Sequence, residues 1–288
     1  MVQRRHKGNW FRLAIQVFFF ALIALIAVNH GLAESSAAIP ILSTASLHAV
    51  CPFGGVVSIY QYLTVGTYTK KIHESSFILM YIVMILTIGF GAVFCGWVCP
   101  FGSFQEWLGK LGRKLFPKSY NNLVPQGLDK FLRVMPYGVL AWVLYMTAVT
   151  GKLSFQGVDP YYALFQFWTG EVATAAFFIL GMTILTSLVV ERAWCKYACP
   201  YGAVLGLVSY LRIFKITRNA GTCTGCKACD RVCPVNIKVS ETGVVRHHQC
   251  NSCLQCTSEG VCPVPATVEL AMPGGKPLIM GWPVKGGK

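Results

Sequence analysis

Two cysteine runs toward the C-terminal end constrain this chain more than any other feature. Residues 223–234 read Cys-x2-Cys-x2-Cys-x3-Cys-Pro, and residues 250–263 read Cys-x2-Cys-x2-Cys-x5-Cys-Pro. In such runs three closely spaced cysteines hold three corners of a cubane iron–sulfur cluster, while the remote fourth cysteine ligates the partner cluster. The two runs therefore predict a pair of [4Fe–4S] clusters.

The spacing assigns four cysteines to each cluster. The first set is Cys223, Cys226, Cys229 and Cys262, and the second is Cys250, Cys253, Cys256 and Cys233. Zinc also binds four thiolates, but zinc sites use two cysteine pairs rather than a triplet with a remote fourth ligand. Disulfides are disfavoured by the close, regular spacing and by the reducing compartment that the charge pattern indicates.

The composition indicates a membrane protein. Of the 288 residues, 54% are hydrophobic and only 12% are charged, which is too apolar for an ordinary soluble protein. Four windows are apolar enough to cross a bilayer as helices, at residues 13–28, 76–94, 131–149 and 172–190. A second interpretation of the first window is a cleavable signal peptide, which would leave three spans.

The net charge of +14 is concentrated beside the ends of these windows. Basic residues precede the first window, fill the connection between the second and third, and follow the fourth. By the positive-inside rule, both termini and the cysteine-rich segment are expected in the cytoplasm. Nucleic-acid binding is the usual alternative for a basic protein, but topology accounts for these residues, so we expect no nucleic-acid partner.

The apolar part contains an internal duplication. Residues 94–102 (FCGWVCPFG) and 194–202 (WCKYACPYG) both read aromatic-Cys-x3-Cys-Pro-aromatic-Gly. Upstream of each copy, Pro52 and Pro160 begin short apolar runs, which we expect to lie in the interface on the outer side of the membrane. Two spans in each half make the halves parallel, with a pseudo-two-fold axis along the membrane normal.

This symmetry can bring four further cysteines together, namely Cys95, Cys99, Cys195 and Cys199. Cysteines at positions i and i+4 share one helix face, so each pair can offer two thiolates to one centre. Four thiolates suit an additional [2Fe–2S] or [4Fe–4S] cluster. A thiol–disulfide redox role and simple packing are the alternatives.

One position on the expected outer side also carries a functional hypothesis. Cys51 corresponds by pseudo-symmetry to Asp159, and His48 lies three residues before Cys51. We interpret these residues as an outer redox or docking site. The alternatives are a lone thiol and an ordinary helix cap, because one His–Cys pair supplies too few ligands for a metal.

No catalytic residues beyond redox chemistry are apparent. The sequence has no phosphate-binding glycine loop, no nucleophile–base arrangement and no c-type haem motif, and its six histidines lie outside the four windows. Haem held by paired histidines within spans is therefore disfavoured.

The order of these motifs resembles the NapH/NosR-type membrane ferredoxins, over roughly residues 11–263. The resemblance implies a respiratory electron-transfer subunit in the inner membrane of a prokaryote, linking cytoplasmic [4Fe–4S] clusters to quinone or to an extracytoplasmic flavin or haem protein. It also implies partner subunits of an oxidoreductase complex, with quinol dehydrogenation as one activity. Residues 48–55 (HAVCPFGG) look closer to polyferredoxins that accompany FMN-binding modules than to NapH. A redox-sensing or metal-reducing assembly factor is the alternative function.

We therefore expect an α-helical membrane protein of four spans with a small cytoplasmic α+β ferredoxin-like domain. The expected units are a first membrane repeat at 1–118, a second at 119–216, the two-cluster domain at 217–272 and an extended arm at 273–288.

Overall fold

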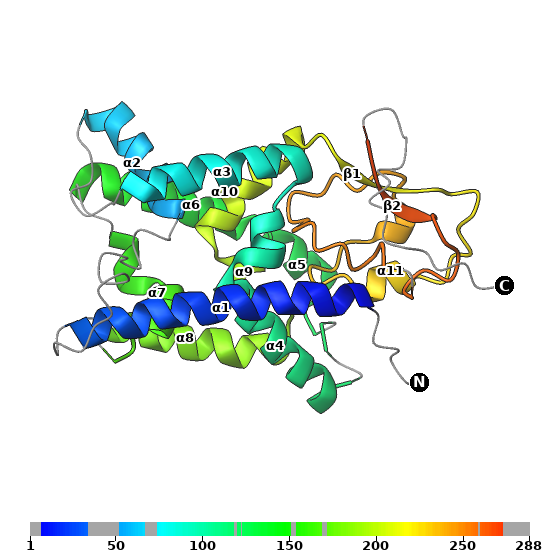
Figure 1. Cartoon of the computed structure of the whole chain (residues 1–288), viewed down its shortest axis with the longest axis horizontal. Coiled ribbons are helices and arrows are strands. Elements are labelled where there is room, and N and C mark those ends of the chain that lie inside the picture. Colours follow the sequence, from blue (N-terminus) through cyan, green and yellow to red (C-terminus); the bar gives the residue numbers. More distant parts are fainter. Residues whose placement is uncertain are drawn as a thin grey trace.

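The computed structural model describes residues 7–33, 52–66, 74–117, 120–121, 123–150, 154–168, 172–258 and 260–272. The described chain is mostly helical, as expected. A bundle of helices forms one part of the molecule, and the cysteine-rich segment with its small sheet caps one end of that bundle (Figure 1).

Long helices coincide with the four apolar windows. They are α1 (Lys7–Ala33), α3 (Glu74–Phe90), α6 (Met135–Thr150) and α8 (Thr174–Ser187). Two stretches, Trp10–Asn29 and Gly127–Thr150, are long and apolar enough to cross a membrane by length and composition, whereas α3 and α8 form shorter apolar helices. Each of the four apolar windows is therefore helical, and two of these stretches reach spanning length.

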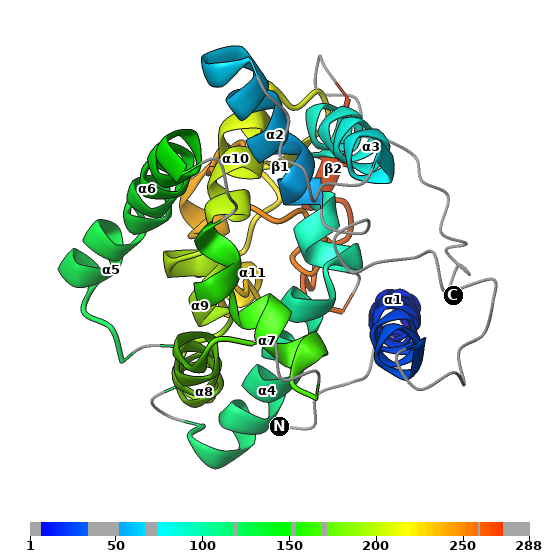
Figure 2. The same ribbon diagram turned by 90° about the vertical axis from the view of Figure 1, so that its left-hand side faces the viewer.

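Shorter elements lie between and beyond these helices. In the end-on view, α1, α3, α6 and α8 stand around the shorter helices of the bundle (Figure 2). The other helices are α2 (Pro52–Val65), α4 (Pro100–Leu115), α5 (Gln126–Leu132), α7 (Pro160–Gln166), α9 (Ala193–Tyr197), α10 (Pro200–Val208) and α11 (Ala228–Arg231), with a π-helical turn η2 (Phe94–Val98) and 3-10 turns η3 (Ser154–Val158), η4 (Ser209–Leu211) and η5 (Val239–Glu241).

The long helices expose apolar side chains and bury polar ones. Two large side chains on each helix are more than 60% exposed, namely Trp10 and Phe18, Ile78 and Ile85, Tyr145 and Val149, and Phe178 and Leu185. The same helices bury Gln16, Thr87, Thr147 and Thr183. Contiguous apolar surface of this kind is rare on soluble monomers and marks a surface that contacts a membrane or another protein.

The Cys-x3-Cys-Pro motifs interrupt their helices. Helix α3 ends before Gly91, whose φ of 85° is in the left-handed region. Cys95 then lies in η2, and Cys99 is extended, with ψ of 114°. The second copy repeats the break, since Cys199 has ψ of 113° just before α10. The prediction that the two cysteines of each pair share one helix face is therefore wrong. The proline ring disfavours the α conformation of the residue before it, and that residue is the second cysteine of each pair.

Helices α2 and α7 pack within the bundle, and their expected place in the outer interface of the membrane stays a prediction. Helix α2 buries Phe53, Val57 and Ser58, and α7 buries Ala163 and Phe165. Figure 2 shows α7 near the middle of the bundle. Both helices are apolar around much of their circumference, so burial on several sides removes more apolar surface from water than a one-sided position would.

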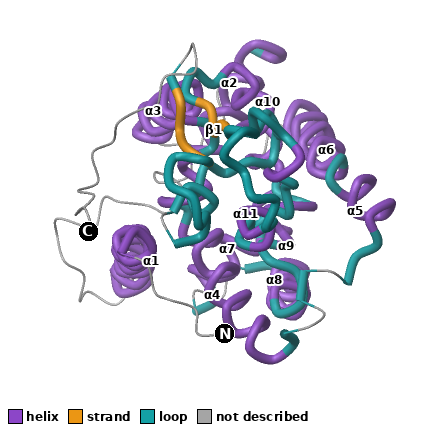
Figure 3. Tube along the Cα trace, turned by 90° about the vertical axis from the view of Figure 1, so that its right-hand side faces the viewer, coloured by secondary structure: helices purple, strands orange, loops and turns teal. Residues whose placement is uncertain are grey.

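The cysteine-rich segment forms a small unit around a two-stranded antiparallel sheet. Strand β1 (Lys215–Arg218) pairs with β2 (Val268–Ala271). Figure 3 shows the sheet beside the loops that carry the cysteines. Its buried core combines Ile216, Val235, Ile237, Val239, Val245 and Val268 with Cys229, Cys250 and Cys256. So small a core buries too little apolar surface to stabilise the fold alone, and bound metal centres supply the missing stability in domains of this size.

Hydrogen bonds fix this segment to both halves of the bundle. In the first half, Trp97 Nε1 donates to the Ser252 carbonyl over 3.1 Å, and Ser252 Oγ donates to the Phe90 carbonyl over 2.7 Å. In the second half, Gln249 Nε2 donates to the Lys196 carbonyl over 2.7 Å. The segment is therefore docked on the bundle.

Candidate iron–sulfur sites

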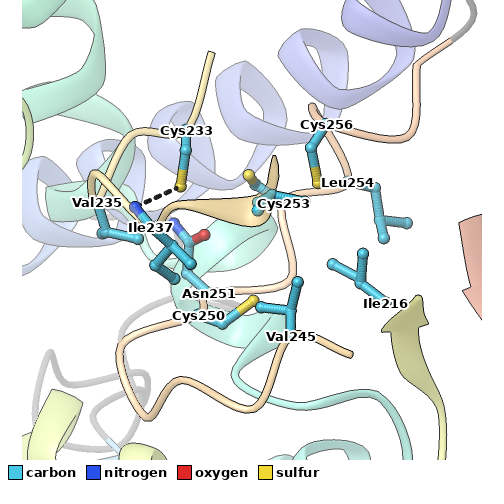
Figure 4. A pocket seen from close by; sticks show the side chains of 11 residues that line it. Ile216, Cys233, Val235, Ile237, Val245, Cys250, Asn251, Cys253, Leu254 and Cys256 are labelled. Carbon is cyan, nitrogen blue, oxygen red and sulfur yellow. Dashed lines mark hydrogen bonds between the residues drawn. The ribbon is translucent and has the colours of Figure 1, made fainter. Parts of the chain in front are cut away.

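The second predicted cysteine set lines one cavity. Cys233, Cys250, Cys253 and Cys256 surround it together with apolar side chains, among them Ile237 and Val245 (Figure 4). The Ile237 N–H donates to Cys233 Sγ over 3.3 Å. The structure thus brings together four thiols that lie up to 23 positions apart in the sequence, from 233 to 256.

The chemistry of these thiols fits a bound iron centre. Burial raises the pKa of Cys233 to about 12, and it also raises the pKa of Cys256. Such thiols hold their protons at neutral pH unless a cation compensates the thiolate charge. Iron ligation supplies that compensation, because metal binding deprotonates its cysteine ligands.

The first predicted set is less completely assembled. Cys229 is buried and interacts electrostatically with Cys256, whereas Cys226 is exposed. Hydrogen bonds from the Gly225 N–H and from the Arg218 side chain lower the pKa of Cys223. Cys262 is half-buried. Cys229 and Cys256 belong to the same buried core, so the two predicted sets are neighbours.

The structure also gathers the four cysteines of the duplicated motif. Cys95, Cys99, Cys195 and Cys199 interact electrostatically in every pairwise combination. The Gly202 N–H donates to Cys199 Sγ over 3.4 Å, and Gln105 Nε2 donates to Cys195 Sγ over 3.2 Å. Donors of this kind stabilise sulfur that carries negative charge.

Among the described residues, no three His, Cys, Asp or Glu side chains are arranged to hold a single metal ion. A cluster separates its thiolate ligands more widely than one ion does, because several iron and sulfide atoms lie between them.

A buried ion network adjoins the duplicated cysteines, and the sequence analysis did not identify it. Glu106 pairs with Arg12 over 2.5 Å and with Arg192 over 2.7 Å, and all three side chains are at most 3% exposed. Arg192 Nη1 donates to the Cys95 carbonyl over 2.6 Å, and Arg12 Nε donates to the Gly96 carbonyl over 3.1 Å. Glu106 is the only acidic residue between positions 75 and 128, which is the one sequence signal that could have revealed it.

Charge pairing controls the ionisation of this carboxylate. Burial by itself would raise the pKa of Glu106, but Arg192, Arg12 and Lys110 outweigh burial and lower it to about 2. Glu106 is therefore ionised at neutral pH, and the network holds two arginine cations around one carboxylate.

A second network joins α5 to α9. Asp129 pairs with Lys196 over 2.6 Å and with Arg133 over 2.7 Å, and it accepts a hydrogen bond from the Tyr197 hydroxyl over 2.6 Å. Lys196 follows Cys195 directly, so this network fixes the position of the second Cys-x3-Cys-Pro motif relative to α5.

The expected outer site is described only in part. Asp159 caps α7 by accepting a hydrogen bond from the Tyr161 N–H over 3.0 Å. This is the ordinary helix cap that the sequence offered as the alternative to a redox or docking role. Asp159 also interacts electrostatically with Cys99, so it lies beside the duplicated cysteines. Cys51 and His48 lie outside the described residues.

Comparison with known proteins supports iron–sulfur binding. A family described as a 4Fe-4S binding domain matches residues 72–119 and 172–219, and each match contains one copy of the duplicated motif. The Escherichia coli protein YccM is 28% identical over 279 residues, covering 93% of this chain and 76% of YccM. No solved structure matches the chain.

Two further relatives carry informative names. The ferredoxin-type protein NapH of Haemophilus influenzae is 30% identical over 186 residues, covering 61% of each chain. The regulatory protein NosR of Pseudomonas aeruginosa is 28% identical over 173 residues, covering 57% of this chain and 23% of NosR. This chain thus matches about a quarter of NosR.

Two 4Fe-4S binding domains, followed by a segment with four cysteines around one cavity, define a ferredoxin-type electron-transport protein. Within that class, the chain belongs to the NapH/NosR-type ferredoxin proteins.

Proposed function

We propose that this protein is a membrane-bound relay for single electrons. It links cytoplasmic [4Fe–4S] clusters to the quinone pool or to an extracytoplasmic redox partner. The observation that carries the proposal is the contact between the two cysteine-bearing parts at Gly96. A Cβ atom at Gly96 would lie 3.4 Å from the backbone N and Cα of Cys253, and Gly96 directly follows Cys95.

Three cysteine sets would hold the clusters. The predicted first and second sets share a buried core through Cys229 and Cys256, and the second set meets the duplicated motif at Cys253 and Gly96. When bound, iron–sulfur clusters accept and donate one electron at a time, at potentials set by hydrogen bonds to sulfur and by burial. The match of a 4Fe-4S binding family to both copies of the duplicated motif supports a third cluster there.

The membrane placement rests on the surface of the bundle. We propose that α1, α3, α6 and α8 cross the inner membrane as four spans in two parallel halves. The outward apolar side chains of these helices support this arrangement, because lipid accommodates them without the unfavourable hydration that water imposes. The basic residues beside the helix ends support a topology with both termini in the cytoplasm.

The route beyond the duplicated cysteines would follow α2 and α7. Phe53 of α2 contacts Tyr201 with a ring-centroid distance of 6.0 Å, and Tyr201 contacts Phe94 at 5.8 Å. In the other half, Asp159 at the start of α7 interacts with Cys99. Both Pro-initiated helices therefore start beside the duplicated cysteines, and we propose that Asp159 and Cys51, with His48, face the quinone or the outer partner.

Iron content tests the third cluster. We expect roughly 12 iron atoms per chain for three cubanes, or about 10 if the third is a [2Fe–2S] cluster. In Cys95→Ser/Cys195→Ser the content should fall to about eight, with loss of one EPR signal, because two of four thiolate ligands are removed. The measurement is anaerobic iron and sulfide quantitation with EPR.

Thr183→Ser, which keeps a hydroxyl on α8, serves as the folding control for this experiment. A content of about eight iron atoms in wild type and double variant alike would remove the third cluster from the proposal and leave the two ferredoxin-type clusters.

A further inference from the structure

A large cleft opens between α5 and the cysteine-rich segment. Its volume is about 1310 Å³, above the roughly 300–1,000 Å³ of ordinary small-molecule sites. One wall comes from residues 113–133 and the other from residues 230–248. The cleft is therefore wide enough to admit part of a protein surface.

The cleft lies against the second cysteine set. Ile237 and Val245 line the cleft and also line the cavity that Cys233, Cys250, Cys253 and Cys256 surround. A single layer of side chains thus separates the two spaces.

Two stacked imidazoles lie in the wall beside that layer. The rings of His247 and His248 stack with a centroid distance of 4.6 Å and an interplanar angle of 22°, and both residues line the cleft. His247 Nδ1 accepts a hydrogen bond from the Gln249 N–H over 3.2 Å, which fixes the ring. A rigid aromatic wall suits the contact surface of a docked protein.

The charge of the cleft is strongly positive. Seven lysine and arginine residues line it against three acidic residues. The inner cations Arg133 and Lys196 are already paired with Asp129, and at the exposed edge Glu241 pairs with Lys238. At the rim, Lys130, Arg231 and Arg246 are exposed, and none of the ion pairs in the described part of the chain includes them.

We propose that this cleft is the docking site of an acidic protein that carries single electrons. The inference rests on the proposed relay function and names the point where electrons are exchanged with the cytoplasm. Exposed cations around a concave surface attract an acidic partner and accelerate its association. With clusters bound, the reduced carrier would lose one electron and the cluster held by the Cys233 set would gain it, with no bond formed and no proton transferred.

Other occupants fit the cleft less well. Residues 273–288 of this chain carry Lys276, Lys285 and Lys288 and no acidic residue, so their charge opposes that of the rim. A free nucleotide needs cations deep in its site for the phosphates, but here the inner cations are held by carboxylates. The exposed rim charges instead suit a broad acidic surface.

The probe for this proposal is a reduced, acidic bacterial ferredoxin with two [4Fe–4S] clusters, titrated into the cluster-loaded protein in detergent. Arg246→Glu should weaken binding about tenfold, which corresponds to about 1.4 kcal/mol. Lys130→Glu/Arg246→Glu, which alters both walls, should weaken it further, and raising the salt should weaken wild-type binding. Calorimetry gives the affinity, and stopped-flow absorbance gives the rate of electron exchange.

Lys114→Glu is the matched control, because it makes the same charge change at an exposed site that does not line the cleft. Iron content should be unaltered in every variant. Equal weakening by Lys114→Glu and Arg246→Glu would overturn the proposal, because the effect would then be one of net charge. The proposal would also be overturned if the ferredoxin did not bind to wild type. It would likewise be overturned if Arg246→Glu weakened the binding of free flavin mononucleotide or of anionic lipid vesicles but not that of the ferredoxin.

The relay function and the docking site can fail separately. If only the relay fails, the ferredoxin still binds and still reduces the protein, but added quinone is not reduced. If only the docking site fails, chemical reduction with dithionite still leads to quinone reduction, while the rim variants leave ferredoxin binding unchanged.

Discussion

Replacement of Gly96 by alanine should slow electron exchange between the ferredoxin-type segment and the duplicated cysteines. The added Cβ would lie 2.4 Å from the Asn251 carbonyl oxygen. That oxygen belongs to the backbone and cannot rotate away, so the whole docked segment must shift. Overpacking of this kind destabilises by about 1–3 kcal/mol.

The measurement is the rate at which one added reducing equivalent distributes between centres, followed by freeze-quench EPR. We expect a decrease of at least tenfold, together with faster proteolysis within residues 219–272, while the iron content is retained. Gly89→Ala is the matched control, since a Cβ at Gly89 meets nothing within 4 Å. If the two alanine variants exchange electrons equally fast, the contact at Gly96 is not on the electron path.

Local spacing explains why the second cysteine set could be predicted. The triplet Cys250, Cys253 and Cys256 is encoded within seven positions, and only Cys233 had to be brought from elsewhere. The apolar windows were equally local, and helices were found at each of them. The break at each second cysteine was also present in the sequence, as the following proline, which restricts the backbone of the residue before it.

Long-range pairing explains what the sequence could not predict. Arg12 was interpreted as a topological charge at a span end, yet it pairs with Glu106, 94 positions away. Arg192 was interpreted in the same way and meets the same carboxylate from 86 positions away. The pattern of charges along the sequence predicts on which side of a membrane the basic residues lie. It does not predict with which carboxylate each basic residue pairs. The cleft between α5 and residues 230–248 has the same origin, because its walls become neighbours only after the segment docks.

The buried network around Glu106 leads to the largest expected loss of stability. Glu106→Gln keeps the side-chain shape but leaves Arg12 and Arg192 buried without a carboxylate between them. Breaking a buried charge pair in this way destabilises by about 3–5 kcal/mol. Because the two arginines also donate to the carbonyls of Gly96 and Cys95, the loss should spread to the duplicated cysteines. We expect a lower midpoint of thermal unfolding and a lower yield of iron-loaded protein.

Lys110→Gln is the matched control for this experiment, because Lys110 also pairs with Glu106 but is 49% exposed. Exposed pairs contribute about 0–1 kcal/mol, so the midpoint should move little. Arg12→Met/Glu106→Gln should recover part of the loss, since one buried cation is removed along with its partner. Equal midpoints for Glu106→Gln and Lys110→Gln would show that the network does not stabilise the fold.

The pH dependence of stability gives the same network an independent signature. The folded-state pKa of Glu106 is about 2, against an ordinary value of 4.5. A carboxylate whose pKa is lowered on folding stabilises the protein above the ordinary value, and this contribution is lost as the pH falls from about 4.5 toward 2. The difference in stability between wild type and Glu106→Gln should therefore be constant near neutral pH and shrink through that acidic range. A difference that stayed constant down to pH 2 would mean that the carboxylate charge is not what holds Arg12 and Arg192 in place.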